Sequence, residues 1–208
     1  MPDIGLFLVA SALLTIAPGP DIIYVLTRGI TQGRRAGFAA AFGFATGVIF
    51  HTALAALGIA ALIRSSEFAF TLVRYAGAAY LVYLGIRMLM SRSAFQWGED
   101  HSSIGSMALR TVYKQSVIGN ALNPKVTLFF LSFLPQFINV NAAHVELQMV
   151  LLGVLFMLQT VLIFGTVAFF SGVIGDKLRA NSAIANRLNV FAGCIFIVLG
   201  IRVAWPTS

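Results

Sequence analysis

The sequence predicts an all-α integral membrane protein with six transmembrane helices. Only 10% of its 208 residues are charged and 59% are hydrophobic, whereas about 25% of the residues of a typical soluble domain are charged. Long charge-poor intervals recur along the chain, and a helix needs about 20 mostly apolar residues to cross a bilayer. These intervals lack the alternation of polar and apolar residues that barrel strands require. The composition therefore excludes a soluble enzyme, a disordered chain and a nucleic-acid-binding module.

Six apolar intervals are long enough to cross the bilayer, and the connections between them are short. We therefore expect a single transmembrane domain over residues 1–208. The first interval follows Asp3 instead of a basic segment and is too long for a signal peptide, so we expect it to be retained as the first span. The expected spans are about 4–27, 38–63, 68–91, 115–138, 147–175 and 188–205.

Lysine and arginine are distributed unequally between the two sides of the expected bundle. Cytoplasmic loops of membrane proteins carry an excess of these residues. Arg64, Arg74 and Arg202 fall on one side, whereas the first, third and fifth loops carry ten basic residues on the other. We therefore expect both termini to lie outside the cytoplasm. The ten residues are Arg28, Arg34, Arg35, Arg87, Arg92, Arg110, Lys114, Lys177, Arg179 and Arg187.

Two short matches indicate an internal repeat. Leu84-Gly85-Ile86-Arg87 ends the third expected span, and Leu199-Gly200-Ile201-Arg202 ends the sixth, 115 residues later. A looser match relates Pro20-Asp21 to Pro124-Lys125, 104 residues later. The alternative is chance identity in a biased composition. A duplication would give two halves of three spans each, inverted because three is odd. Inverted repeats with broken helices at matching places are typical of secondary transporters, whose binding site lies near the bilayer midplane.

The segment Pro18-Gly19-Pro20-Asp21 interrupts the first expected span. Each proline lacks an N–H and clashes with the carbonyl four residues earlier, so the carbonyls of Leu14 and Ile16 lose their helical partners. Such carbonyls are tolerated inside a membrane where protein or a water-filled cavity satisfies them, which favours a polar cavity over a simple packing kink. Asp21 lies about 10 Å inside the expected cytoplasmic end. At that depth a carboxyl group either carries protons or extends to the interface.

The segment Asn123-Pro124-Lys125 interrupts the fourth expected span in the same way, and Pro124 frees the carbonyl of Asn120. Lys125 lies about 13 Å inside the span, and an uncharged stretch follows it as far as Glu146. One interpretation is a lysine that extends to the interface. The functional interpretation is a fixed cation that receives a carboxylate.

His51 lies in the second expected span, one helical turn after Gly47, which forms with Gly43 a pair whose spacing permits close helix packing. A histidine at this depth either relays protons or makes a structural hydrogen bond. We expect no metal site, cofactor or enzymatic activity, because the spans lack a cluster of ligating residues and the chain lacks the common enzyme motifs. The candidate substrate- or ion-binding residues are Pro18, Gly19, Pro20, Asp21, His51, Asn123, Pro124 and Lys125.

These motifs resemble those of the LysE/RhtB family of bacterial amino-acid exporters. The resemblance extends along the whole chain, and that family often has Asn where this chain has Asp21. It implies a multi-pass exporter of the homoserine/threonine efflux type in the inner membrane, driven by the proton gradient. The motifs are APGPD at 17–21, GFATG at 43–47, RYAGAAYLVYLG at 74–85, NPK at 123–125 and FFLSFLPQF at 129–137.

Several alternatives remain open for the transported compound. A neutral amino acid such as threonine, homoserine or leucine is expected, because the spans offer no acid beyond Asp21 to pair with a basic side chain. A lysine exporter would need Asp21 as that partner, and an inorganic-ion transporter of related six-span architecture would need several buried carboxylates. The expected partners are the substrate, protons and the lipid bilayer, with no nucleic acid. The face formed by Gly37, Gly43 and Gly47 could serve internal packing or a homodimer.

Overall fold

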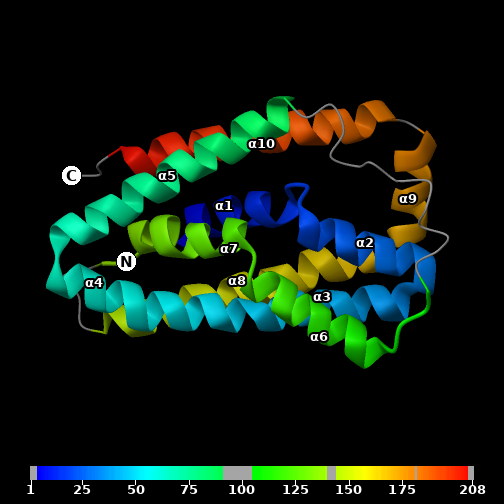
Figure 1. Cartoon of the computed structure of the whole chain (residues 1–208), viewed down its shortest axis with the longest axis horizontal. Coiled ribbons are helices and arrows are strands. Elements are labelled where there is room, and N and C mark those ends of the chain that lie inside the picture. The colour runs from blue at the N-terminus through cyan, green and yellow to red at the C-terminus, as the bar shows by residue number, and fades with distance from the viewer. Residues whose placement is uncertain (1–3, 91–104, 140–143, 181, 206–208) are drawn as a thin grey trace.

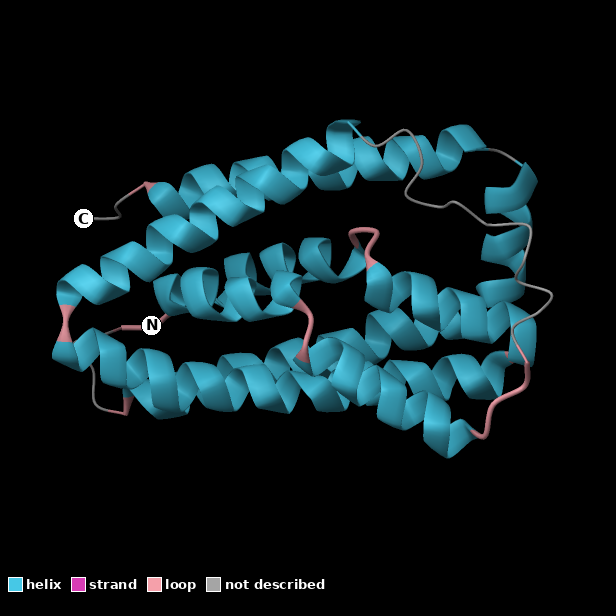
Figure 2. Ribbon diagram, in the orientation of Figure 1, coloured by secondary structure: helices cyan, strands magenta, loops and turns pink. Residues whose placement is uncertain are grey.

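The computed structural model describes residues 4–90, 105–139, 144–180 and 182–205, and this part of the chain is helical without any strand. Figure 2 shows the helices and the short connections between them. The described residues form ten α-helices, two π-helical segments (Leu54–Ile59 and Phe129–Phe133) and a 3₁₀ turn (Leu134–Phe137). The α-helices are α1 (Ile4–Ile16), α2 (Pro20–Gln32), α3 (Arg34–Ala53), α4 (Ala60–Ser65), α5 (Glu67–Met90), α6 (Leu109–Ala121), α7 (Pro124–Leu128), α8 (Val145–Phe169), α9 (Ser171–Ala180) and α10 (Ser182–Ala204).

Within the described residues, four helical segments are long and apolar enough to cross a membrane: Arg34–Leu62, Glu67–Met90, Val145–Phe169 and Asn186–Ala204. Two further helix pairs pass the same test when each pair is taken together. The α1–α2 pair bends by 57° at its break, and α6 with the segment Pro124–Phe137 bends by 44°. The molecule is therefore an all-α membrane protein whose six spans include two broken ones, as the composition predicts.

Apart from α9, which stands across one end, the long helices run lengthwise, and the connections of the two broken pairs lie midway along the molecule (Figure 1). Helix α1 begins and α10 ends at one end, where α4 also meets α5. The α2–α3 connection and α9 lie at the other end, which we call the basic end because Arg34, Arg35 and Lys177 lie there. Arg92 lies outside the described residues, and so do the side chains of Arg64 and Arg179.

Helices α5 and α10 lie side by side in opposite directions and make the most extensive contact among the described helices (Figure 1). A methyl group on Gly85 would lie 2.6 Å from the carbonyl oxygen of Gly193 and 2.7 Å from Ile197 Cγ1. In the repeat of 115 residues, Gly193 corresponds to Ala78 and Ile197 corresponds to Val82.

The contact that the repeat relates to this one is also present. A methyl group on Gly200, the repeat counterpart of Gly85, would lie 2.8 Å from the carbonyl oxygen of Ala78 and 2.7 Å from Val82 Cγ2. Each helix therefore presents the same positions to the other, as the two partners of a two-fold symmetric interface do. This reciprocity supports an inverted repeat over chance identity.

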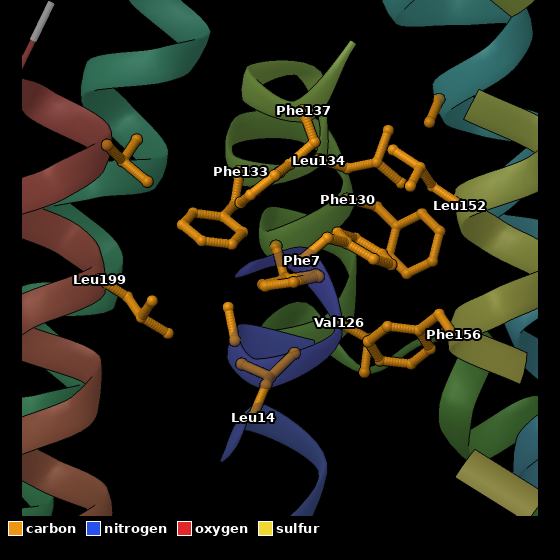
Figure 3. Packing of buried hydrophobic residues seen from close by; sticks show 14 of the residues in the cluster. Phe7, Leu14, Val126, Phe130, Phe133, Leu134, Phe137, Leu152, Phe156 and Leu199 are labelled. Carbon is orange, nitrogen blue, oxygen red and sulfur yellow. The ribbon is translucent and has the colours of Figure 1, made fainter. Parts of the chain in front are cut away.

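A cluster of phenylalanines fills the bundle between the two breaks and the end at which α10 terminates. Phe7 of α1 lies 5.5 Å from Phe137, and Phe129 lies 4.9 Å from Phe133, measured between ring centroids. Figure 3 shows Phe7 close to the rings of the second broken span, with Phe156 of α8 nearby. The rings of Phe7, Phe129 and Phe133 are completely buried, so aromatic side chains pack the interior of this half of the bundle.

The helix boundaries differ from the expected spans at two arginines. Helix α2 continues to Gln32, so Arg28 is part of a helix and is buried, with its Nη1 donating to Gln32 Oε1 at 2.7 Å. The described part of α5 reaches Met90, level with the α1–α2 break and far short of the basic end (Figure 1). Arg87, expected in a loop, therefore lies on α5 at the depth of that break.

Candidate functional site

The first break follows from its two prolines. The amide of Ala17 still donates to the carbonyl of Leu13, and the next helical bond runs from Ile23 to Gly19, so the ladder is interrupted between them. Gly19 is extended and precedes α2, with Pro20 in the first turn, where its missing N–H costs no hydrogen bond. The end of α1 and the start of α2 therefore lie inside the bundle, where their free carbonyl and N–H groups need partners.

The second break is organised by Asn123. Its side-chain oxygen accepts a hydrogen bond from the amide of Lys125 at 3.0 Å and so caps α7. Pro124 frees the carbonyl of Asn120, as the sequence predicts. That carbonyl accepts instead from the amide of Asn123 at 2.8 Å and from His51 Nε2 at 2.8 Å.

The carboxylate of Asp21 lies in the first turn of α2 and binds to the second break. Asn123 Nδ2 donates to its Oδ1 at 2.8 Å, and Asn120 Nδ2 donates to its Oδ2 at 2.9 Å. The Asp21 side chain is 5% exposed, so it does not extend to the interface. The helix N-terminus and the two amides stabilise a negative charge here.

The ammonium group of Lys125 binds in the opposite direction, to the first break. Nζ donates to the carbonyl of Leu14 at 3.1 Å and to that of Ala17 at 3.3 Å, at the C-terminus of α1. Leu14 is one of the two carbonyls that the prolines were expected to free, and Ala17 takes the place of Ile16. A cation at a helix C-terminus is favourable because the unpaired carbonyls carry negative partial charge.

His51 of α3 is fully buried and lies against the ring of Phe130, with a centroid separation of 5.8 Å. A carbonyl can only accept, so Nε2 carries the proton in the hydrogen bond to Asn120. Nδ1 has no hydrogen-bond partner within the described part of the chain, and the same holds for Asn120 Oδ1. A chain of contacts therefore runs from His51 through Asn120 to Asp21.

Asp21 and Lys125 line one cavity of about 10 Å³, together with Thr15, Asn120 and Thr160. This volume corresponds to about one water molecule. The cavity therefore cannot hold an amino acid in this conformation, although both charged groups face it.

A second and larger cavity lies on the other side of the first break. It has a volume of about 450 Å³, within the range of small-molecule sites. Gly19 alone separates this cavity from the ammonium group of Lys125, because a methyl group on Gly19 would lie 3.0 Å from Lys125 Nζ. Its lining residues are Pro18, Gly19, Pro20, Ile23, Leu84, Arg87, Met88 and Asn189.

All eight candidate residues gather around the two breaks. Pro18, Gly19 and Pro20 lie between the two cavities, and His51 is connected through Asn120. Sequence reasoning missed Asn120 and Arg87 as site residues. Asn120 is the residue whose carbonyl Pro124 frees, and Arg87 ends the repeated tetrapeptide, so both carried a signal that was not used.

Comparison with known proteins places this architecture in a family. Residues 12–206 match the family described as LysE type translocator. A leucine efflux protein of Enterobacter sp. (strain 638) is 32% identical over 203 residues, covering 95% of this chain and 93% of its own. The membrane protein YrhP of Bacillus subtilis (strain 168) is 32% identical over 198 residues, covering 92% and 93%. No solved structure matches the chain. The family match covers nearly the whole sequence, and we conclude that this chain belongs to the LysE-type translocators.

Proposed function

We propose that the protein exports a small neutral amino acid across the bacterial inner membrane, with leucine, threonine and homoserine as the leading substrates. The observation that carries this proposal is the pair of broken spans that exchange charged side chains at the centre of the bundle. Such breaks form the substrate and ion sites of secondary transporters. The leucine efflux relatives support the same substrate class.

A neutral substrate fits the charges of the site better than lysine does. Asp21 is the one acidic side chain that is buried among the described residues. Both of its oxygens already accept hydrogen bonds from Asn120 and Asn123. A second ammonium group on the substrate would therefore need a carboxylate that this part of the chain does not offer, and an unpaired buried charge is costly.

The contrast between the half packed with phenylalanines and the part that contains the larger cavity supports transport by alternating access. The phenylalanine cluster fills the half toward the chain termini, while the cavity of about 450 Å³ lies beside the first break. By the positive-inside rule the basic end is cytoplasmic, so this conformation would receive substrate from the cytoplasm. Both termini would then lie outside.

Proton coupling rests on Asp21 and His51. Both side chains are buried in the bundle, and His51 Nδ1 is a buried acceptor without a partner among the described residues. One charge that moves across the membrane contributes about 2.3 kcal/mol per 100 mV. A proton that enters through this centre could therefore drive a neutral zwitterion outward.

Everted membrane vesicles test the proposed function, because their cytoplasmic face is outward. Vesicles that contain the protein should accumulate labelled leucine or threonine when respiration acidifies the interior, and a protonophore should abolish the accumulation. Vesicles without the protein are the control. Accumulation of lysine alone would contradict the neutral substrate, and accumulation that survives the protonophore would contradict proton coupling.

A further inference from the structure

We propose that the cavity of about 450 Å³ is the site at which the substrate binds from the basic end, with Arg87 as the residue that receives its carboxylate. This inference rests on the proposed function and assigns the parts of the substrate to named residues. The site in question is separate from the cavity between Asp21 and Lys125, which is too small for an amino acid.

The position of Arg87 is the first argument. Arg87 lines the same cavity as Pro18, Gly19 and Pro20. Eight residues of α2 separate Pro20 from Arg28, about 12 Å along the helix, so Arg87 lies well inside the basic end. A guanidinium at this depth is costly unless it has a partner or faces a polar cavity. Arg87 is exposed, its guanidinium lies 5.9 Å from the Tyr83 ring and interacts with Tyr80, and no described carboxylate pairs with it.

The electrostatics of the cavity is the second argument. The N-terminus of α2 opens on it through Pro20, and the first N–H groups of a helix favour an anion. Lys125 Nζ lies directly behind Gly19. Three sources of positive potential therefore lie around this cavity. The guanidinium of Arg87 can bind a carboxylate with two parallel hydrogen bonds.

The lining also has an apolar part, formed by Ile23, Leu84 and Met88, which we call the apolar wall; these side chains are partly exposed. These side chains provide a surface for an aliphatic side chain of the leucine type, whereas a basic side chain would find no acid among the lining residues. The amide of Asn189 and the backbone of the break are the polar groups of the lining that would face the α-ammonium of the substrate. The cavity thus matches each part of a neutral aliphatic amino acid.

A binding experiment on the purified full-length protein tests this assignment without relying on transport. A ligand that binds the folded state raises the melting temperature. Leucine should raise it, and leucinamide, which lacks the carboxylate, should require at least tenfold higher concentration for the same shift. In Arg87→Gln the leucine requirement should rise about tenfold to a hundredfold, the loss expected for a hydrogen bond to a charged group. The preference for leucine over leucinamide should disappear.

Arg110→Gln is the matched control, because it removes a basic charge from an exposed position on α6 that lies outside the cavity. It should keep the wild-type response and the preference for leucine. An unchanged leucine response in Arg87→Gln would overturn the assignment, and so would the absence of any shift with neutral amino acids in the wild type. A normal Arg87-dependent shift combined with failed vesicle transport would instead contradict the proposed function alone.

A second variant tests the apolar wall. Leu84→Trp narrows the cavity from α5, so it should weaken the response to leucine by about tenfold and the response to alanine by much less. Equal effects on leucine and alanine would show that Leu84 does not contact the substrate side chain, and would remove the apolar wall from the proposal.

Discussion

Asp21 and Lys125 occupy matching positions in the two broken spans, and each side chain binds to the other break. Asp21 accepts hydrogen bonds from Asn120 and Asn123, while Lys125 donates to the carbonyls of Leu14 and Ala17. The two charges do not form a direct ion pair. They face a common small cavity, so each compensates a helix end while remaining near the other. A movement of one break relative to the other must therefore break the hydrogen bonds that Asp21 and Lys125 make across them.

We predict that Lys125→Ala abolishes export. The variant leaves the carbonyls of Leu14 and Ala17 without their donor and removes the positive charge from the centre. Labelled leucine uptake into everted vesicles measures the loss, with protein level checked by immunoblot. Lys114→Ala on α6 is the matched control because Lys114 is an exposed lysine. Full uptake by Lys125→Ala would remove this residue from the mechanism.

Asp21→Asn should uncouple transport from the proton gradient. Asparagine has nearly the same shape but cannot take up the coupling proton. We expect the variant to exchange labelled for unlabelled leucine across vesicles without a gradient, and to lose accumulation against a gradient. If His51→Asn, and not Asp21→Asn, shows this pattern, His51 carries the proton. Gradient-driven accumulation by both variants would contradict a role for either residue.

Gly85→Ala should destabilise the protein by about 1–3 kcal/mol, because the added methyl group would force the α5 and α10 backbones apart. Its Cβ would lie 2.6 Å from the Gly193 carbonyl oxygen. Thermal unfolding in detergent measures the effect. Gly119→Ala is the control, since its nearest neighbour is Phe44 Cε1 at 3.6 Å and alanine favours the helix. Equal melting temperatures for both variants would show that this contact is not tight.

The inverted repeat predicts a second carboxylate-binding residue on the opposite side. Arg202, Leu199 and Val203 correspond to Arg87, Leu84 and Met88, and Leu199 and Val203 are buried. We expect a counterpart of the open cavity to form beside Pro124 when transport reverses the two halves. Arg202→Gln should leave the KM measured from the cytoplasmic face unchanged and raise it about tenfold in right-side-out vesicles. Equal changes in KM on both faces would contradict the assignment of Arg202 to the opposite side.

Single cysteines should report the expected orientation in a variant whose Cys194 is replaced by serine. Glu67→Cys, where α5 begins, should react with a membrane-impermeant maleimide in intact cells. Arg110→Cys, where α6 begins, should react only after the cells are opened. The physical reason is the excess of basic residues at the end that carries Arg110. The reverse pattern would invert the topology and the direction of transport.

The sequence by itself determined where the helices break, because a proline acts on its own helix. Pro18, Pro20 and Pro124 each lack a backbone N–H and clash with the carbonyl four residues earlier. Both of the resulting helix interruptions are present in the structure. The scarcity of charged residues likewise identified a membrane protein from the sequence alone. The repeated LGIR tetrapeptide indicated a symmetry that the reciprocal contacts of Gly85 and Gly200 support.

Only the tertiary structure decided which groups satisfy the broken helix ends. Lys125 meets Leu14, and Asp21 meets Asn120, across about a hundred residues of sequence. Contacts at such separation depend on how the helices pack, and the local pattern of residues does not specify that packing. The depth of Arg87 was hidden for the same reason. Because Arg87 lies near the end of an apolar stretch, the sequence alone predicts a loop residue. The packing of the helices shows instead that α2 continues far beyond the level of Arg87.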